Sequence, residues 1–180
     1  MTPRLRCSVL VAVGLIARAA PAAAQYNRDD QDRRDRPSPA VSFLAGPSNY
    51  HLSGTGTAFA AAIRFDVPTG RLFILEPGMG FFRYRTKVGT TIKYLLPEIG
   101  LQFQPIHGPV RPYLGVGAGF SEYLTGPGPS PGTVHAVAGL RVRVTGDYGF
   151  RGEIRVRGLD PFSGQQMTDL TFGLTKRLAR

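Results

Sequence analysis

From Pro39 onward an apolar residue recurs at every second position, and this period of two constrains the fold more than any other feature of the chain. Between Ala136 and Val144 the even-numbered positions are all apolar, while the odd-numbered positions include Arg141 and Arg143. Alternate side chains of a β-strand point to opposite faces, whereas a helix repeats about every 3.6 residues. The pattern therefore predicts an all-β chain whose strands have one apolar and one charged face.

The alternation by itself permits two kinds of β-structure. A soluble sandwich or barrel buries its apolar face and exposes the charged one. A membrane barrel turns its apolar face to lipid and lines its lumen with polar side chains. Other features of the chain must decide between them.

The N-terminus has the composition of a secretory signal peptide. Two arginines precede the apolar run 8–16, and small residues follow as far as Ala24. The apolar run is roughly half as long as a membrane-spanning helix requires. We therefore predict a signal peptide over residues 1–24 that is cleaved on export. Cys7 lies within it, so the exported chain would contain no disulfide.

The next segment, residues 25–38, carries four arginines, four aspartates and no aliphatic side chain. Such a composition cannot bury a core, so we predict a disordered, charged lead-in. Loss of the three arginines of the signal peptide lowers the net charge from +10 to +7. The basic residues are dispersed along the strands of an exported chain, which is why we expect no nucleic-acid partner.

Turn signals divide residues 39–180 into eight alternating segments: 39–47, 57–67, 71–84, 91–104, 110–124, 134–144, 148–158 and 167–178. Most are long enough for a tilted strand to cross the hydrocarbon layer. Tight turns at 67–70, 104–109 and 145–147 alternate with longer links at 48–56, 85–90, 124–133 and 159–166. This arrangement predicts an eight-stranded antiparallel up-and-down transmembrane β-barrel with both termini in the periplasm.

Three segments resemble the small outer-membrane β-barrel proteins of OmpA-like and OmpX-like type: Leu75–Phe82, Pro112–Ser121 and Asp169–Leu178. The resemblance covers residues 39–180. It implies the outer membrane of a Gram-negative bacterium, insertion by the barrel-assembly machinery and contact with outer-membrane lipid, including lipopolysaccharide. It implies no single activity, because a fold does not fix a function. We expect a monomer without a cofactor.

One parity of the strands carries most of the charged side chains, which we expect to fill the lumen. A buried charge without a partner is costly, so the sequence predicts an interior network of ion pairs and water in which glutamates lie among arginines. The predicted lumen residues are Arg64, Asp66, Glu76, Glu98, Arg141, Arg143, Arg151, Glu153, Arg155, Arg157, Asp169 and Arg177. Glycines of the same parity are expected to make room for the arginines. An interior filled by side chains argues against an open channel.

The opposite parity supplies an apolar face for lipid. Aromatic belts at the two membrane interfaces are expected from tyrosines near strand ends, namely Tyr50, Tyr84, Tyr94, Tyr113, Tyr123 and Tyr148. Proline removes one donor of a strand ladder, so Pro77 and Pro97 are expected to mark bulges.

A group of cations surrounds the second long link: Arg83, Arg85, Lys87 and Lys93. At an outer rim these residues would contact lipopolysaccharide phosphates through charge-assisted hydrogen bonds. The alternative is a solvated loop whose charge provides solubility.

Candidate catalytic residues are few. No spacing of cysteine, histidine and carboxylate predicts a metal site. His135 is expected at the rim of the sixth strand, bound to water, although a hydrolase dyad with Ser130 is an alternative. Glu76 and Glu98 on adjacent strands suggest either a paired-carboxylate site or, more simply, ion pairs with lumen arginines.

Three functions remain open from the sequence. The first is a non-enzymatic outer-membrane barrel with a structural, envelope-stabilising or surface-interaction role. The second is a soluble exported barrel of lipocalin type that binds an apolar ligand inside. The third is a lipid-modifying outer-membrane enzyme, such as a lipid A-type acyl hydrolase, that uses His135.

Overall fold

The computed structural model describes residues 37–52, 55–85, 89–125, 130–159 and 165–178. The predicted signal peptide and most of the predicted lead-in lie outside these residues. The described strands are β1 (Ala40–His51), β2 (Thr55–Pro68), β3 (Phe73–Arg85), β4 (Thr91–Phe103), β5 (Val110–Phe120), β6 (Glu122–Tyr123), β7 (Gly132–Thr145), β8 (Tyr148–Leu159) and β9 (Gln165–Arg177). None of the described residues forms a helix long and apolar enough to cross a membrane.

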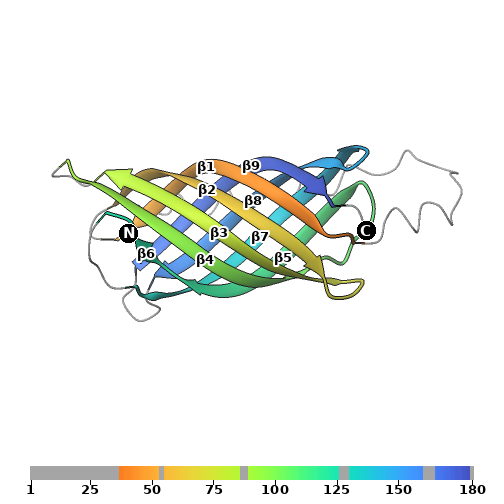
Figure 1. Ribbon diagram of the computed structural model, residues 1–180, viewed down its shortest axis with the longest axis horizontal. Helices are drawn as coiled ribbons and strands as arrows, with labels where there is room; N and C mark the ends of the chain where they lie inside the picture. The colour runs from red at the N-terminus through yellow and green to blue at the C-terminus, as the bar shows by residue number, and fades with distance from the viewer. Residues whose placement is uncertain (1–36, 53–54, 86–88, 126–129, 160–164, 179–180) are drawn as a thin grey trace, which may run out of the picture. The chain divides into compact units, whose positions relative to one another are not determined.

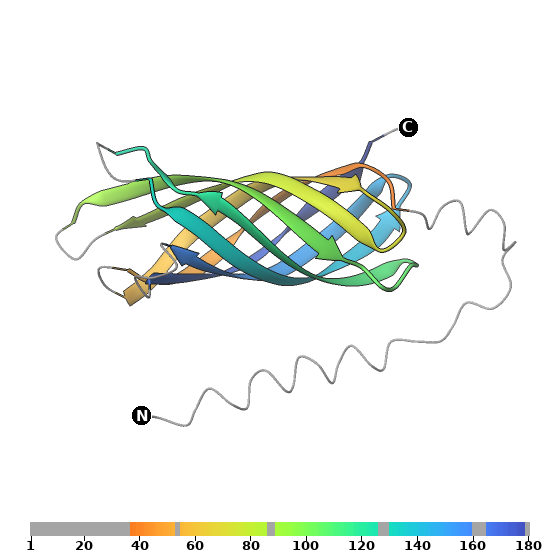
Figure 2. The same ribbon diagram turned by 90° about the horizontal axis from the view of Figure 1, so that it is seen from below.

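The strands form one closed antiparallel barrel. Their order is β3-β2-β1-β9-β8-β7-β5-β4, and pairing between β3 and β4 closes the ring. The short β6 follows β5 and pairs with β4, so it continues the same wall of the barrel. Figures 1 and 2 show the strands inclined to the long axis of the barrel. The predicted eight-stranded up-and-down barrel is confirmed.

The prolines inside the strands interrupt the ladders without shifting them. The β2–β3 ladder has a gap between Gly78 and Leu75, beside Pro77, and its register is the same on both sides. The wall formed by β5 and β6 likewise keeps its register against β4 past Pro97. The predicted bulges are therefore wrong, because the intact pairs on each side hold the register when one donor is lost. A register shift instead occurs in the β7–β8 ladder, at residues 143–145.

The connections at one end of the barrel are shorter than the sequence suggested. β1 extends to His51 and β2 begins at Thr55, so most of the predicted link 48–56 is paired strand. Asn49 accepts a 3.1 Å hydrogen bond from the Thr57 hydroxyl across this extension. In Figure 1 β3 ends at the left-hand end of the barrel, which we call the loop end. The β2–β3 turn lies at the right-hand end, the turn end.

The two faces of the wall differ sharply in polarity. Large apolar side chains point outward along the strands and remain exposed, for example Leu114 at 62%, Val116 at 64% and Phe172 at 58%. Phe43 on β1 joins this exterior. The side chains of the other parity are buried inside the barrel, and many of them are charged.

Candidate functional site: the barrel lumen

The side chains in the lumen form three layers along the barrel. An aromatic and apolar cluster occupies the loop end, and ion pairs occupy the middle. A small cavity of about 60 Å³ lies at the turn end, where Arg141 and Asp66 are among its lining residues. Each layer consists of inward side chains from several strands. Its composition depends on which of these side chains lie at the same height along the barrel axis.

The middle layer matches five arginines with five carboxylates. Its arginines are Arg64, Arg141, Arg151, Arg155 and Arg157, and its carboxylates are Asp66, Glu76, Glu98, Glu153 and Asp169. All ten are buried, with at most 9% of any residue exposed. Because charges of both signs are present in equal number, the layer neutralises itself without bulk water.

Glu76 on β3 is one centre of this layer. Its Oε1 accepts a 2.7 Å hydrogen bond from Arg155 Nη2. Its Oε2 forms an ion pair with Arg151 and also accepts from Gln102 Nε2. Both oxygens are therefore committed to donors from other strands.

Glu98 on β4 is the second centre. Arg64 Nη1 lies 2.8 Å from Glu98 Oε2, and Arg157 Nε donates to Oε1. Arg155 Nη1 bridges the two centres, since it lies 3.4 Å from Glu98 Oε2 while the same guanidinium binds Glu76. Glu76 and Glu98 thus act as ion-pair acceptors, which leaves no free carboxylate pair for acid–base chemistry.

Two of the predicted lumen residues lie outside this layer. Arg143 and Arg177 are half-buried near the turn end, and both line the cavity there. The structure thus separates them from the ten charges that form the middle layer. Their positions near strand ends account for the difference, because the strand walls no longer enclose them fully.

The predicted place of Tyr113 in an aromatic belt is wrong. Tyr113 is 2% exposed inside the lumen, where its hydroxyl donates to Glu153 Oε2 at 2.8 Å and accepts from Arg151 Nε at 2.8 Å. The Arg141 guanidinium lies 4.3 Å from the centre of its ring. The alternation along β5 predicts this position, because the neighbouring Leu114 points outward and Tyr113 must then point inward.

Four other predicted belt residues also point inward. Tyr84 and Tyr94 belong to the buried cluster at the loop end, and Tyr50 and Tyr123 pack against it. The cluster surrounds Phe82, which is fully buried, and Tyr94 donates its hydroxyl to Tyr123 at 2.5 Å. Of the six tyrosines, Tyr148 alone has the exposure expected of a belt, at 53%. Nearness to a strand end was the wrong criterion, because parity decides the face.

Inward glycines leave space for large side chains from neighbouring strands. A Cβ on Gly78 would lie 2.7 Å from both Cδ and Nη1 of Arg64. A Cβ on Gly117 would lie 2.5 Å from the ring of His135. These glycines therefore set where the long or bulky groups of the lumen can lie.

His135 is not a rim residue, and that prediction was wrong. It is 5% exposed, its Nε2 lies 2.7 Å from Arg155 Nη1, and its Nδ1 lies 3.7 Å from Glu98. Ser130, the other half of the suggested dyad, donates instead to Glu122 at 2.7 Å on the exposed surface. The two residues are not brought together. No group of three metal-binding side chains occurs among the described residues.

The described cations of the second link lie on the outward face at the loop end. Arg83 and Arg85 are exposed on β3, and Lys93 is half-buried on β4. Arg83 lies directly opposite Lys93 in the β3–β4 ladder. Lys87, the fourth predicted member, falls outside the described residues.

An apolar exterior around a charged, filled interior defines the class of the protein as a small β-barrel of the outer-membrane type. Solved structures of that type are similar to the described barrel. Neisserial surface protein A matches with a TM-score of 0.66 and 14% identity over 78% of this chain and 97% of the other. OprG of Pseudomonas aeruginosa matches with a TM-score of 0.52 and 12% identity over 81% and 98%.

A third similar structure is Ail, the attachment invasion locus protein of Yersinia pestis, with a TM-score of 0.51 and 12% identity over 78% of this chain and 97% of the other. At such identities the similarity concerns the fold. A scan of protein-family models finds no match, and a search of curated proteins finds no similar sequence.

Proposed function

We propose that this protein is an outer-membrane barrel that is closed to solutes and serves a non-enzymatic, structural or surface-interaction role in the envelope. The proposal includes export with a cleaved signal peptide, insertion by the barrel-assembly machinery and a monomeric state in the membrane. It also includes contact with lipopolysaccharide through the outer cationic patch, which we define as Arg83, Arg85, Lys87 and Lys93.

The inverted polarity of the wall carries this proposal. Ile154 on β8 and Leu170 on β9 are 50% and 40% exposed on the outside. Arg155, which follows Ile154 on β8, is 1% exposed on the inside. Exposed apolar side chains on the outside are unfavourable in water and favourable in lipid. The charges on the inside are stabilised by ion pairs with one another. A lipocalin-like carrier requires an apolar interior, so the buried charges contradict that alternative.

The packed lumen supports a closed barrel. Arginine–carboxylate pairs fill the middle, and the Phe82 cluster fills the loop end. The internal cavity beside Phe82 and Arg157 has a volume of about 10 Å³, room for about one water molecule. A continuous aqueous path would require these side chains to leave their partners.

The geometry of the outer cationic patch favours an anionic partner. Like charges directly opposite one another in a ladder destabilise a sheet, and Arg83 faces Lys93 in this way. A phosphate between the two side chains would convert the repulsion into charge-assisted hydrogen bonds. With both termini on the periplasmic side, the loop end lies at the outer leaflet, where lipopolysaccharide presents phosphates.

Membrane location is tested by fractionation and electrophoresis. We expect the protein to remain in the membrane fraction until detergent is added and to migrate differently before and after boiling, as closed barrels do. Release with the periplasm without detergent would overturn the membrane part of the proposal.

Lipopolysaccharide contact is tested with two charge-matched variants. We expect Arg83→Gln/Lys93→Gln to weaken binding of purified lipopolysaccharide to the detergent-solubilised protein by about tenfold, since each charge-assisted contact is strong. The control Arg71→Gln/Lys176→Gln removes two exposed cations at the turn end and should leave the affinity unchanged. Equal affinities for the wild type and Arg83→Gln/Lys93→Gln would overturn this part alone.

A further inference from the structure

His135 on β7 is a titratable side chain enclosed by the middle layer, although the arginines and carboxylates of that layer balance one another without it. The residue is 5% exposed, and its Nε2 lies 2.7 Å from Arg155 Nη1. A guanidinium can only donate a hydrogen bond, so Nε2 must be the acceptor and the proton of a neutral ring must be on Nδ1. The contact with Arg155 therefore fits the neutral form of His135 and excludes the protonated form.

Cations outnumber anions around the ring. Four charged side chains from three other strands act on it: Arg64 on β2, Glu98 on β4, and Arg155 and Arg157 on β8. Glu98 Oε1 lies 3.7 Å from His135 Nδ1. This carboxylate is already paired with Arg64 at 2.8 Å and with Arg157. On the β5 side the ring meets Gly117, which carries no charge. A second proton on the ring would therefore lie among three guanidinium groups and one carboxylate that is already shared.

The guanidinium that His135 contacts is the one that joins the two centres of the middle layer. Arg155 Nη2 donates to Glu76 Oε1 at 2.7 Å, and Nε donates to Glu153 Oε1 at 3.1 Å. Arg155 Nη1 lies 3.4 Å from Glu98 Oε2 and is the same atom that donates to the ring of His135. If Nε2 of the ring carried a proton, two donors would face each other at this point. Protonation of His135 therefore requires Arg155 or the ring to move.

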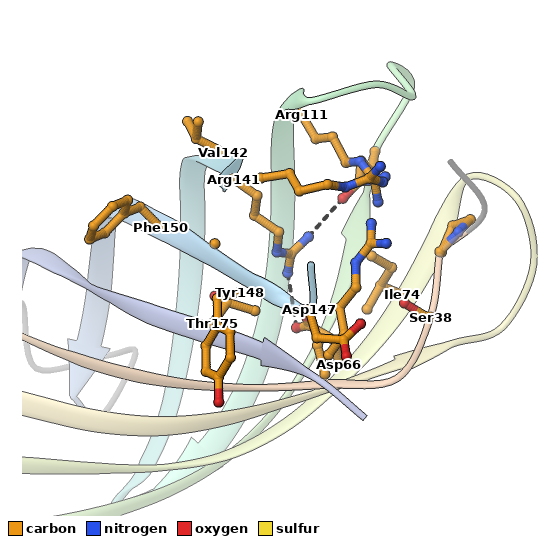
Figure 3. Close-up of a pocket in the computed structure, with 16 residues that line it drawn as sticks. Ser38, Asp66, Ile74, Arg111, Arg141, Val142, Asp147, Tyr148, Phe150 and Thr175 are labelled. Atoms are coloured by element: carbon orange, nitrogen blue, oxygen red, sulfur yellow. Dashed lines mark hydrogen bonds and ion pairs between the residues drawn. The ribbon is translucent and has the colours of Figure 1, made fainter. Parts of the chain in front are cut away.

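The position of His135 differs from that of the other two histidines of the chain. His51 at the end of β1 and His107 in the β4–β5 connection are exposed, so either can bind a proton without rearrangement of the lumen. The turn-end side of the middle layer pairs Arg141 with Asp66 at 2.9 Å, as Figure 3 shows. Protonation of a histidine would therefore act on the other side of the layer, where His135 lies.

We propose that His135 is a proton-sensitive latch of the packed lumen: the neutral ring holds Arg155 between Glu76 and Glu98, and protonation of the ring releases it. The step transfers one proton from water to Nε2 and breaks one hydrogen bond, the one donated by Arg155 Nη1. The middle layer, which is balanced when the ring is neutral, then has one excess cation, and a buried charge without a partner is costly. The barrel is therefore most stable at neutral pH and loosens in acid. This inference rests on the contacts inside the lumen and not on lipopolysaccharide contact.

The latch is tested by urea titration of the full-length protein in lipid vesicles between about pH 7.5 and about pH 5, above the ordinary range of carboxylates. We expect the folding equilibrium constant of the wild type to fall by up to about tenfold for each pH unit below about 6.5, because the unfolded chain binds a proton that the latched barrel excludes. His135→Gln keeps an oxygen that can accept from Arg155 but binds no proton, so this decline should be absent. His51→Gln makes the same change at an exposed position and should decline as the wild type does.

A decline of equal size in the wild type and His135→Gln would overturn the proposal, and so would a wild type whose stability does not change over this range. A measurement on the wild type alone covers the case in which His135→Gln does not fold. Nitrogen NMR of the isotope-labelled protein in detergent micelles distinguishes bare from protonated ring nitrogens. At about pH 7.5 we expect a bare Nε2 and a protonated Nδ1 for His135, since Nε2 accepts from Arg155.

The same spectra follow the release of Arg155. On acidification we expect protonation of His135 Nε2 together with a change in the guanidinium signals of Arg155. A protonated Nε2 at neutral pH would overturn the proposal, because Arg155 could not then donate to it. Protonation of Nε2 with unchanged Arg155 signals would also overturn it, because the ring would then hold no latch.

Discussion

Arg155 on β8 donates a 2.7 Å hydrogen bond from Nη2 to Glu76 Oε1 on β3, directly across the lumen. Three strands separate β3 from β8 in either direction around the barrel: β2, β1 and β9 on one side, and β4, β5 and β7 on the other. The contact therefore joins opposite walls. It links the β8 arginines to β3, a strand with which β8 forms no backbone hydrogen bonds.

Replacing Glu76 should test the value of this link. Glu76→Gln leaves Arg151 and Arg155 buried with one fewer counter-charge, and breaking a buried pair in this way costs about 3–5 kcal/mol. We expect the free energy of unfolding, measured by urea titration in lipid vesicles, to fall by that amount. Glu122→Gln, the same change on the exposed surface, should alter it by less than about 0.5 kcal/mol. Equal losses in the two variants would contradict a network that depends on Glu76.

The aromatic cluster at the loop end predicts a different contrast. Phe82 is fully buried among tyrosines, so Phe82→Ala should leave a cavity and lower the free energy of unfolding by about 3–5 kcal/mol. Phe172 is 58% exposed on the outside, where lipid chains can fill the space that Phe172→Ala vacates. We expect a smaller loss there in the same urea titration. A larger loss in Phe172→Ala would show that the inward cluster is not a packed core.

The lipid-facing surface predicts a dependence on depth. Ile154 lies near the middle of β8, and an arginine there should reduce the free energy of unfolding in vesicles by about 2–4 kcal/mol. Val144 is equally outward but next to the end of β7, so Val144→Arg should cost about 0–1 kcal/mol. In a soluble barrel both substitutions would fall on a hydrated surface, and equal effects would therefore contradict a membrane-spanning wall.

The space at Gly117 predicts a coupling with His135. Gly117→Ala places a Cβ 2.5 Å from the His135 ring and 2.4 Å from the Ile99 carbonyl oxygen, and should destabilise the barrel by about 1–3 kcal/mol. Gly132→Ala is the control, since its nearest neighbour would be at 4.0 Å. The double variant Gly117→Ala/His135→Ala should recover part of the loss caused by Gly117→Ala, as judged by thermal loss of the heat-sensitive mobility. Strict additivity of the two substitutions would contradict the predicted coupling and show that the Ile99 carbonyl, not the His135 ring, limits the space at Gly117.

The strands, their order and their two faces were predictable because each depends on local sequence. The two-residue period from Ala136 to Val144 assigns Arg141 and Arg143 to one face without knowledge of any other strand. The same rule, applied to β5, would have placed Tyr113 in the lumen. The belt prediction for Tyr113 is wrong because nearness to a strand end does not decide which face a side chain occupies.

Which inward side chains meet was not accessible from local sequence. His135 and Glu98 are 37 positions apart and on strands that are not adjacent in the sheet order, yet they lie 3.7 Å apart. The aromatic cluster likewise assembles residues from β1, β3, β4 and β6, each of which contributes one or two rings. Such contacts depend on how far each strand is displaced along the barrel axis relative to its neighbours.

Alternation along one strand is fixed by the geometry of its own backbone, and so the amino-acid order alone specifies strands with one apolar and one charged face. The structure decides that the apolar face is the exterior and the charged face the interior. Closure of the barrel fixes the height at which each inward side chain lies. That height places five arginines with five carboxylates in the middle, aromatic rings at the loop end, and a small cavity at the turn end. These heights are set only in the closed sheet, because each depends on the registers between all neighbouring strands around the barrel.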